Sequence, residues 1–251
     1  GGNALWTPQG VTTDTVGAIV AGTDLGTSPV SIAETMVREF YSYRSPLVSL
    51  SLSPAAGARE IGQTISTPIL TPTTTRRTNP ITTLTLSRAS TLIHTYPTPN
   101  PAGGTEAPYT DTSGAVSADT TYTATVGDGT STSNGTATYS FLPGRYTGVS
   151  TSVITTGAGV ISAFGASVVL ASSYAATFTF DCSVGGGGNY CYVAYPTSFG
   201  LPASTRFNGF TFTAYTVTTA SLTNASGYTQ NYYIFKTDNT YSAAAVTWQF
   251  L

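Results

Sequence analysis

Charge is what this sequence has least of. Only 8% of its 251 residues are charged, whereas an ordinary soluble domain carries about 25%. Nine basic and eleven acidic side chains give a formal net charge of −2, and Arg76 and Arg77 are the only adjacent cations. Nucleic-acid binding depends on clustered cations that neutralise phosphates, so the composition argues against it.

Long hydrophobic runs are also missing. No stretch reaches the roughly 18 consecutive apolar residues that indicate a membrane-spanning helix, and the segment VGAIV at 16–20 is too short for the core of a signal peptide. We therefore expect no membrane insertion. A chain with so little charge lacks the usual protection against association, so contact with other copies or with a surface is expected.

Residues that carry enzyme chemistry are scarce. His94 is the only histidine, and no Gly-x-Ser-x-Gly motif supplies a nucleophile. The run Gly185 to Gly188 lacks the Lys-Ser/Thr pair of a phosphate loop. Asp128, in a Gly-Asp-Gly turn, is expected to serve a hairpin rather than calcium, which takes about six to eight oxygen ligands. We predict a protein that is not an enzyme and uses no metal or other cofactor.

Cysteine is limited to Cys182 and Cys191, which flank the segment SVGGGGNY. If the segments on either side form a hairpin, the two side chains can close a disulfide loop worth about 2 to 3 kcal/mol. A disulfide suits an oxidising exterior. Two buried free thiols are the alternative because one pair is not a disulfide framework, and a zinc site lacks further ligands.

Short alternating runs are what the sequence has in quantity. They include VSLSLS at 48–53, ITTLTLS at 81–87 and STLIHTY at 90–96. Clusters rich in Pro, Gly, Asn and Thr separate them, among them TPTTTRRTNP at 71–80. Alternation of apolar and polar residues indicates half-buried strands, and strands at such spacing are typical of a β-sandwich.

The first 45 residues contain the one convincing helix pattern. Thr27 or Ser28 can cap it, and three apolar residues recur at every fourth position: Ile32, Met36 and Phe40. Their apolar face is too small to form a core, so we expect this arm to dock on a neighbouring domain or subunit.

Two β domains follow the arm. In residues 46–141, the run DTTYTATV at 119–126 places Tyr122 where many immunoglobulin-like (Ig-like) domains carry a tyrosine corner. Residues 142–251 are again rich in aromatic and β-branched strand formers, and FLPGRYTG at 141–148 marks the boundary. The predicted fold class is all-β, with two consecutive β-sandwich domains, the first Ig-like, preceded by a short helical N-terminal arm at 1–45.

Three tyrosines, Tyr190, Tyr192 and Tyr195, share one short segment. A tyrosine offers a large apolar ring and a hydroxyl, which suits contact with sugars or proteins. Packing in the core or at a subunit interface explains these residues best, and a surface contact is the alternative.

The order of these features resembles that of structural proteins encoded by tailed phages. It runs from VGAIVAGTDL through SLSLSPAAGAREIGQTI and DTTYTATVGDGTSTSNGTATYSF to TFTFDCSVGGGGNYCYVAYPTSFG and FNGF. Similar modules occur in tail fibres and other virion surface parts, and an aromatic YxYxAYPxSFG element is matched here by Tyr190, Tyr192, Ala194, Tyr195, Pro196, Ser198, Phe199 and Gly200.

The resemblance implies a structural subunit of an extracellular assembly, most of all a phage virion component such as a tail fibre, located in the virion or outside the cell. The expected partners are further copies of this chain, other virion or filament subunits, and a glycan or protein of a host surface. Two alternatives stay open. One is a pilin-like or S-layer-like subunit of a cellular secreted filament, and the other is a monomeric carbohydrate-binding adhesin domain.

Overall fold

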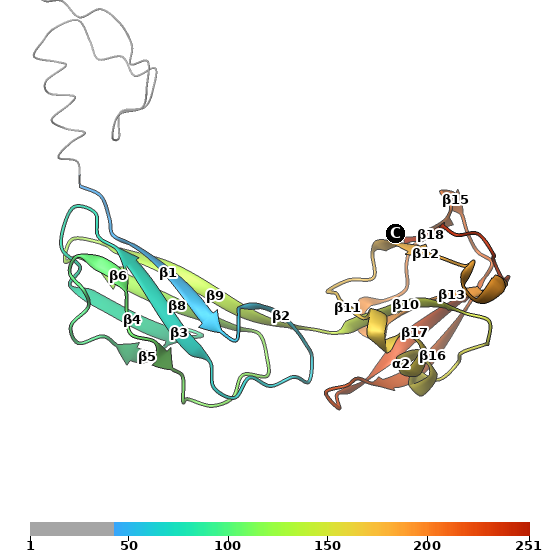
Figure 1. Cartoon of the computed structure of the whole chain (residues 1–251), viewed down its shortest axis with the longest axis horizontal. Helices are drawn as coiled ribbons and strands as arrows, with labels where there is room; N and C mark the ends of the chain where they lie inside the picture. The colour runs from blue at the N-terminus through green and yellow to red at the C-terminus, as the bar shows by residue number, and fades with distance from the viewer. Residues whose placement is uncertain (1–42) are drawn as a thin grey trace, which may run out of the picture.

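The computed structural model describes residues 43–251, so the predicted helix of the arm lies outside the described residues. The described chain is mostly β-strand and forms two groups of sheets that lie end to end (Figure 1). One hydrophobic cluster draws its buried residues from positions 52–141, and two others draw theirs from positions 146–250. We call these parts the N-terminal domain, 43–142, and the C-terminal domain, 144–251.

Two sheets form the N-terminal domain. One has β3 (Ile69–Thr75) between β1 (Leu47–Ser53) and the short strands β6 (Gly103–Thr105) and β7 (Tyr109–Thr110). The other has five strands in the order β2 (Gly57–Glu60), β9 (Thr132–Leu142), β8 (Thr120–Gly127), β4 (Thr83–Arg88) and β5 (Thr91–Thr95). Only β2 and β9 pair in parallel in this domain. Side chains of both sheets share one core, which makes an Ig-like sandwich.

The alternation read from the sequence explains which side chains enter this core. Leu84 and Leu86 of β4 are buried, while the threonines and serine between and beside them face outward. In β8 the same alternation buries Tyr122, Ala124 and Val126. Successive side chains of a strand point to opposite faces, so one face of each strand joins the core and the other meets solvent.

The segment 71–80, expected as a turn cluster, is strand up to Thr75. Pro72 lies within β3 and accepts a hydrogen bond from the Glu106 N–H through its carbonyl oxygen (3.0 Å). Proline has no N–H to donate in return. The neighbouring strand is interrupted at this level, between Thr105 of β6 and Tyr109 of β7.

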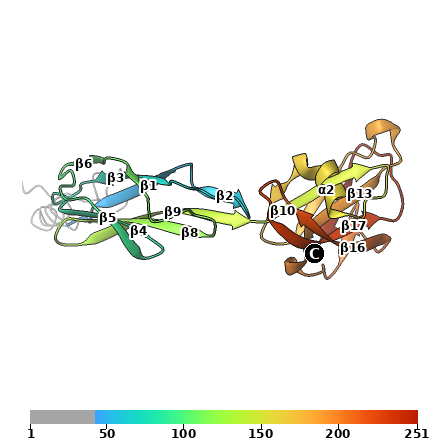
Figure 2. The same cartoon turned by 90° about the horizontal axis from the view of Figure 1, so that it is seen from below.

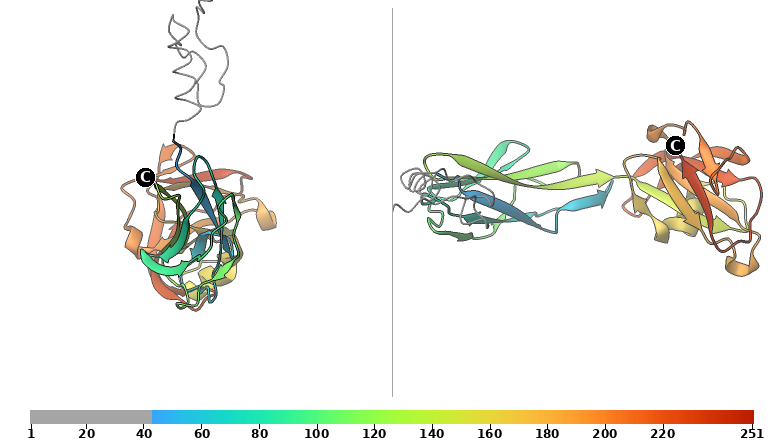
Figure 3. Two further views of the ribbon diagram at one scale, coloured as in Figure 1. Left: turned by 90° about the vertical axis from the view of Figure 1, so that its left-hand side faces the viewer. Right: turned by 90° about the horizontal axis from the view of Figure 1, so that it is seen from above.

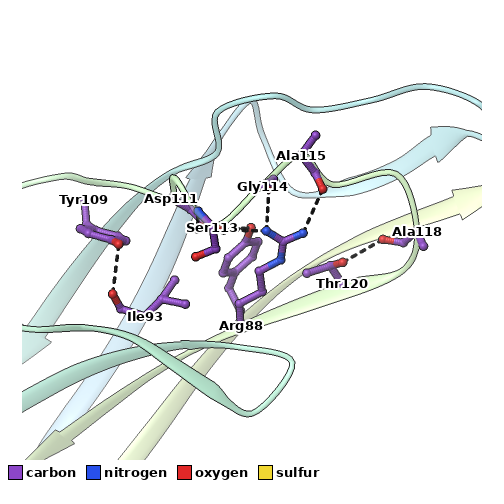
Figure 4. A network of polar contacts seen from close by, with 10 residues as sticks. Arg88, Ile93, Tyr109, Asp111, Ser113, Gly114, Ala115, Ala118 and Thr120 are labelled. Atoms are coloured by element: carbon purple, nitrogen blue, oxygen red, sulfur yellow. Dashed lines mark hydrogen bonds and ion pairs between the residues drawn. The ribbon is translucent and has the colours of Figure 1, made fainter.

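A buried polar network joins β4, β8 and the loop before β8. The Tyr122 hydroxyl donates to Asp111 Oδ2 (2.7 Å), and Arg88 Nη1 forms an ion pair with the same oxygen at 3.2 Å. The Arg88 guanidinium also donates to the carbonyl oxygens of Gly114 and Ala115 (Figure 4). Tyr122 therefore occupies the position of a tyrosine corner, with a carboxylate in place of the usual backbone acceptor.

The loop between β4 and β5 consists of Ala89 and Ser90, which both have positive φ angles, 45° and 73°. Two-residue hairpin loops of type I′ require positive φ at both positions, and Asn-Gly meets this requirement best. Non-glycine residues in this region are strained. We expect the double substitution Ala89→Asn, Ser90→Gly to stabilise the N-terminal domain by about 1 kcal/mol, measured as a higher urea midpoint. Ala89→Val, a β-branched change at the same site, should lower it.

Two sheets also form the C-terminal domain. The first has the order β11 (Val169–Leu170), β10 (Gly144–Ser150), β13 (Tyr190–Pro196), β17 (Thr229–Thr237) and β16 (Tyr215–Thr223). The second has the order β12 (Ala176–Phe180), β18 (Val246–Phe250), β14 (Thr205–Phe207) and β15 (Phe210–Thr211). The two sheets meet in the larger aromatic core, which includes Phe235 of β17 and Trp248 of β18.

A helix, α2 (Gly157–Phe164), covers the other face of the first sheet. No pattern in the sequence predicts this helix. The Thr156 hydroxyl caps the start of the helix by accepting the Gly159 N–H (3.1 Å). Val160 and Phe164, on the side of the helix that faces the sheet, are buried. A Cβ at Gly157 would overlap the carbonyl oxygen of Ser221 in β16, so only glycine allows this approach. Because two of its eight residues are glycine, helix propensity alone does not predict α2.

One residue, Pro143, separates the end of β9 from the start of β10. Figures 2 and 3 show these strands passing from one domain into the next along the long axis of the molecule. The connection therefore has very little length in which to bend, and its φ angle is fixed by the proline ring.

Candidate interaction surfaces

The tyrosine segment is not an exposed surface. Tyr192 and Tyr195 are both fully buried, and Tyr190 is half-buried. The surface-contact interpretation is therefore wrong for Tyr192 and Tyr195. The reason is that β13 is the central strand of its sheet and is covered on both faces, by α2 on one side and by the second sheet on the other.

Each tyrosine of β13 has a packing role. The Tyr192 hydroxyl donates to the Ser152 carbonyl oxygen and accepts the Ile154 N–H, both at 3.0 Å, so it holds the loop that leads to α2. Tyr195 packs against three near-parallel rings, those of Phe235, Tyr174 and Phe199, at centroid distances of 5.2, 5.9 and 6.2 Å. Burial raises the pKa of both tyrosines above the ordinary value.

Tyr190 differs because it borders solvent. The ammonium group of Lys236 lies 4.3 Å from the centre of its ring, which is a cation–π contact. Lys236 is the only lysine of the chain. Of the three tyrosines, Tyr190 alone keeps surface that a partner can reach.

The two cysteines do face each other. Cys182 and Cys191 are fully buried, with their sulfur atoms 3.3 Å apart as thiols. Burial raises the pKa of both thiols above the ordinary value. The side-chain amide of Asn189 donates to the Cys182 carbonyl oxygen (3.0 Å), which fixes the loop between them. The disulfide stays a prediction.

His94 and Asp128 have local roles. His94 stacks on Tyr109, with ring centroids 4.3 Å apart and planes 18° from parallel. Asp128 accepts the N–H groups of Thr130 and Ser131, each at 3.0 Å, and so closes the β8–β9 turn as predicted. Within residues 43–251, no group of three or more His, Cys, Asp or Glu side chains is placed to hold a metal ion.

The outer face of β4, β8 and β9 in the five-stranded N-terminal sheet is lined mainly by hydroxyl and amide side chains. Thr121 and Thr138 are hydrogen-bonded at 2.9 Å, and Thr125 donates to the Asn134 side chain at 2.8 Å. We call this surface the hydroxyl face, and it consists of Thr85, Ser87, Thr121, Thr123, Thr125, Asn134, Thr136 and Thr138. The one charged residue of β4, β5, β8 and β9 is Arg88, whose guanidinium bonds to the 111–115 loop.

A second candidate surface is the β14–β15 hairpin. Its turn is Asn208-Gly209, with φ angles of 49° and 85°, the favoured type I′ pair. Asn208 Oδ1 accepts the Thr247 N–H (2.8 Å), which ties the turn to β18. Phe210 leaves this rigid turn 78% exposed, more than any other large hydrophobic side chain in the described residues. The FNGF pattern, an Asn-Gly pair between two aromatic residues, was the available sequence signal.

Comparison with known proteins gives no family. No protein-family model and no curated protein matches this chain. One similar solved structure contains the N-terminal eight Ig domains of Down syndrome cell adhesion molecule, isoform 1.30.30, with 11% sequence identity and a TM-score of 0.24. The match covers 78% of this chain and 23% of that chain. A likeness this weak supports no conclusion about function. Among residues 43–251, no helix is long and apolar enough to cross a membrane.

Proposed function

We propose that this protein is a structural subunit of an extracellular assembly, most specifically a phage virion component such as a tail fibre, that acts by self-association and surface attachment. The observation that carries the proposal is the hydroxyl face. Three neighbouring strands, β4, β8 and β9, carry the hydroxyl and amide groups of this face, with no charged side chain among them to repel a like surface.

Association through such a face has a physical basis. Charged groups must be desolvated or paired when two surfaces meet, whereas hydroxyl groups can exchange hydrogen bonds with water for hydrogen bonds with a partner. Threonine in a strand is also stiff, so little side-chain freedom is lost on contact. The end-to-end domains and the short connection at Pro143 suit an extended subunit.

The decisive experiment is negative-stain electron microscopy, with mass measurement, on native source material. Fibres, rings or tubes that contain this chain are expected, and their attachment to tails or capsids distinguishes a virion part from a cellular filament. A uniform monomer near 26 kDa under native conditions would contradict the proposal. It would favour the monomeric adhesin domain. The contact residues of such a domain would not include Tyr192 and Tyr195, because both are buried.

Phe210 is expected to anchor one contact of the assembly. Aromatic residues held rigidly at a surface are frequent binding hot spots, and truncating one weakens binding by more than about 1 kcal/mol. Phe210→Ala should therefore weaken self-association about tenfold, measured by sedimentation equilibrium, with an unchanged Tm. The control is Val153→Ala in the loop between β10 and α2, where the side chain is 60% exposed. An equal loss in both variants would show that the effect is not specific to the hairpin.

A further inference from the structure

The turn at the end of the β16–β17 hairpin contacts the other domain. This turn, residues 224–228, belongs to the C-terminal domain, and the segment it meets, residues 61–62, follows β2 of the N-terminal domain. Asn224 Nδ2 donates to the carbonyl oxygen of Ile61 at 2.7 Å, a hydrogen bond between residues 163 positions apart in sequence.

The hydrogen bonds around Asn224 fix the orientation of its amide. Its Oδ1 accepts the N–H of Ser226 at 3.0 Å and the N–H of Tyr228 at 2.9 Å, within its own turn. The oxygen is therefore committed to the hairpin, and the nitrogen is left to face the neighbouring domain. One side chain both closes the turn and connects it to Ile61.

The segment that contains the acceptor, Ile61, allows the turn to come close. Gly62 has a φ of +94°, and a Cβ at this position would lie 2.5 Å from Tyr228 Cβ. Glycine is therefore required here for two reasons, the backbone conformation and the close contact with Tyr228. Ile61 is itself anchored, because its N–H donates to the Leu142 carbonyl oxygen at the end of β9 (3.0 Å).

A second contact lies at the same boundary. The Tyr146 hydroxyl, on β10, donates to Glu60 Oε1 at 3.4 Å. The neighbouring Tyr232 donates to the Gly144 carbonyl oxygen at 2.9 Å, next to Pro143. The covalent connection at Pro143 and the hairpin contact at Asn224 thus hold the boundary at separate points. Two attachments restrict both bending and rotation about the connection, which a single proline does not.

We infer that the 224–228 turn is a clamp that fixes the two domains in one orientation. Domains joined by a short segment move relative to each other by default unless their interface holds them. Here the clamp makes the pair a single rigid body, so that a partner bound at the far end of one domain is held at a defined angle to the other. The inference concerns this chain alone and does not depend on the proposed assembly.

Asn224→Asp is the most selective test. The carboxylate keeps an oxygen for the Ser226 and Tyr228 N–H groups but cannot donate to the Ile61 carbonyl oxygen, which it repels. Residual dipolar couplings of the full chain in a dilute alignment medium report the orientation of each domain. We expect both domains of the wild type to fit one shared alignment tensor, and those of the variant to require two. The matched control is Asn134→Asp, the same charge change on β9 away from the boundary, which should keep the shared tensor.

Gly62→Ala tests the clamp from the other domain, since its methyl group would displace Tyr228, and it decides the matter if Asn224→Asp does not fold. Chemical shifts of β16 and β17 that match the wild type show that the hairpin itself is intact. Two tensors in the wild type, or one shared tensor in both boundary variants with the hairpin intact, would overturn the inference.

Discussion

Replacing Asp111 with alanine is expected to lower the unfolding free energy of the N-terminal domain by about 2 to 4 kcal/mol, because a buried charge pair loses one partner. Asp111 is fully buried and receives the Tyr122 hydroxyl, the Ser113 N–H and the Arg88 guanidinium. Without the carboxylate, the Tyr122 hydroxyl is left buried with no acceptor. The loss stays below the largest known values because 20% of the Arg88 side chain is exposed to water.

The measurement is urea unfolding followed by resolved NMR signals of each domain, since two domains need not unfold together. The C-terminal domain serves as an internal control, and its midpoint should not move. Tyr122→Phe removes one hydrogen bond but keeps the ion pair, so a smaller loss of about 1 kcal/mol is expected. If Asp111→Ala and Tyr122→Phe gave the same loss, the ion pair would contribute nothing to stability.

The same network predicts a dependence on pH. Burial by itself raises the pKa of Asp111, but the hydrogen bonds from Tyr122 and Ser113 and the charge of Arg88 outweigh it, so the pKa lies below the ordinary value of 3.8. A carboxyl group with a depressed folded-state pKa contributes stability above its unfolded pKa and loses it as the pH falls through the folded one. The stability difference between wild type and Asp111→Asn should therefore shrink below pH 3.8.

Oxidation of the thiol pair is expected to have the second large effect. When molecular oxygen or glutathione disulfide accepts two electrons and two protons from Cys182 and Cys191, a disulfide closes the loop between them. Restricting the unfolded chain in this way should stabilise the C-terminal domain by about 2 to 3 kcal/mol, which raises its Tm by about 10 °C. The buried sulfur atoms lie 3.3 Å apart, so little movement is needed.

Calorimetry with and without a reductant measures this effect, and a mass loss of about 2 Da identifies the disulfide. Cys182→Ala is the control, and its Tm should not respond to reductant. Two thiols that remain open to alkylation in the unfolded, air-exposed protein would contradict the prediction. Because both thiols are buried, full reduction of the native protein should be slow.

Several features could be predicted from the sequence because they depend on neighbouring residues. The alternation in ITTLTLS and DTTYTATV indicates the strands β4 and β8 and which of their faces is buried. The Gly-Asp-Gly turn and the position of Tyr122 follow from the same local patterns. In contrast, YCYVAYP is a nearly continuous apolar run, which is typical of a strand covered on both faces. That signal would have placed Tyr192 and Tyr195 in the interior.

The sequence by itself determined strands such as β4 and β8, their inward faces and the scarcity of charge, since strand periodicity and composition are local properties. Tertiary structure alone decided which strands lie side by side and what covers them. The pairing of Arg88 with Asp111, the cover of α2 over β13, and the contact of Asn224 with Ile61 each join segments that are distant along the chain. Such contacts form only when the chain between the two partners closes into a loop. The residues beside either partner therefore do not indicate which distant residue it will contact.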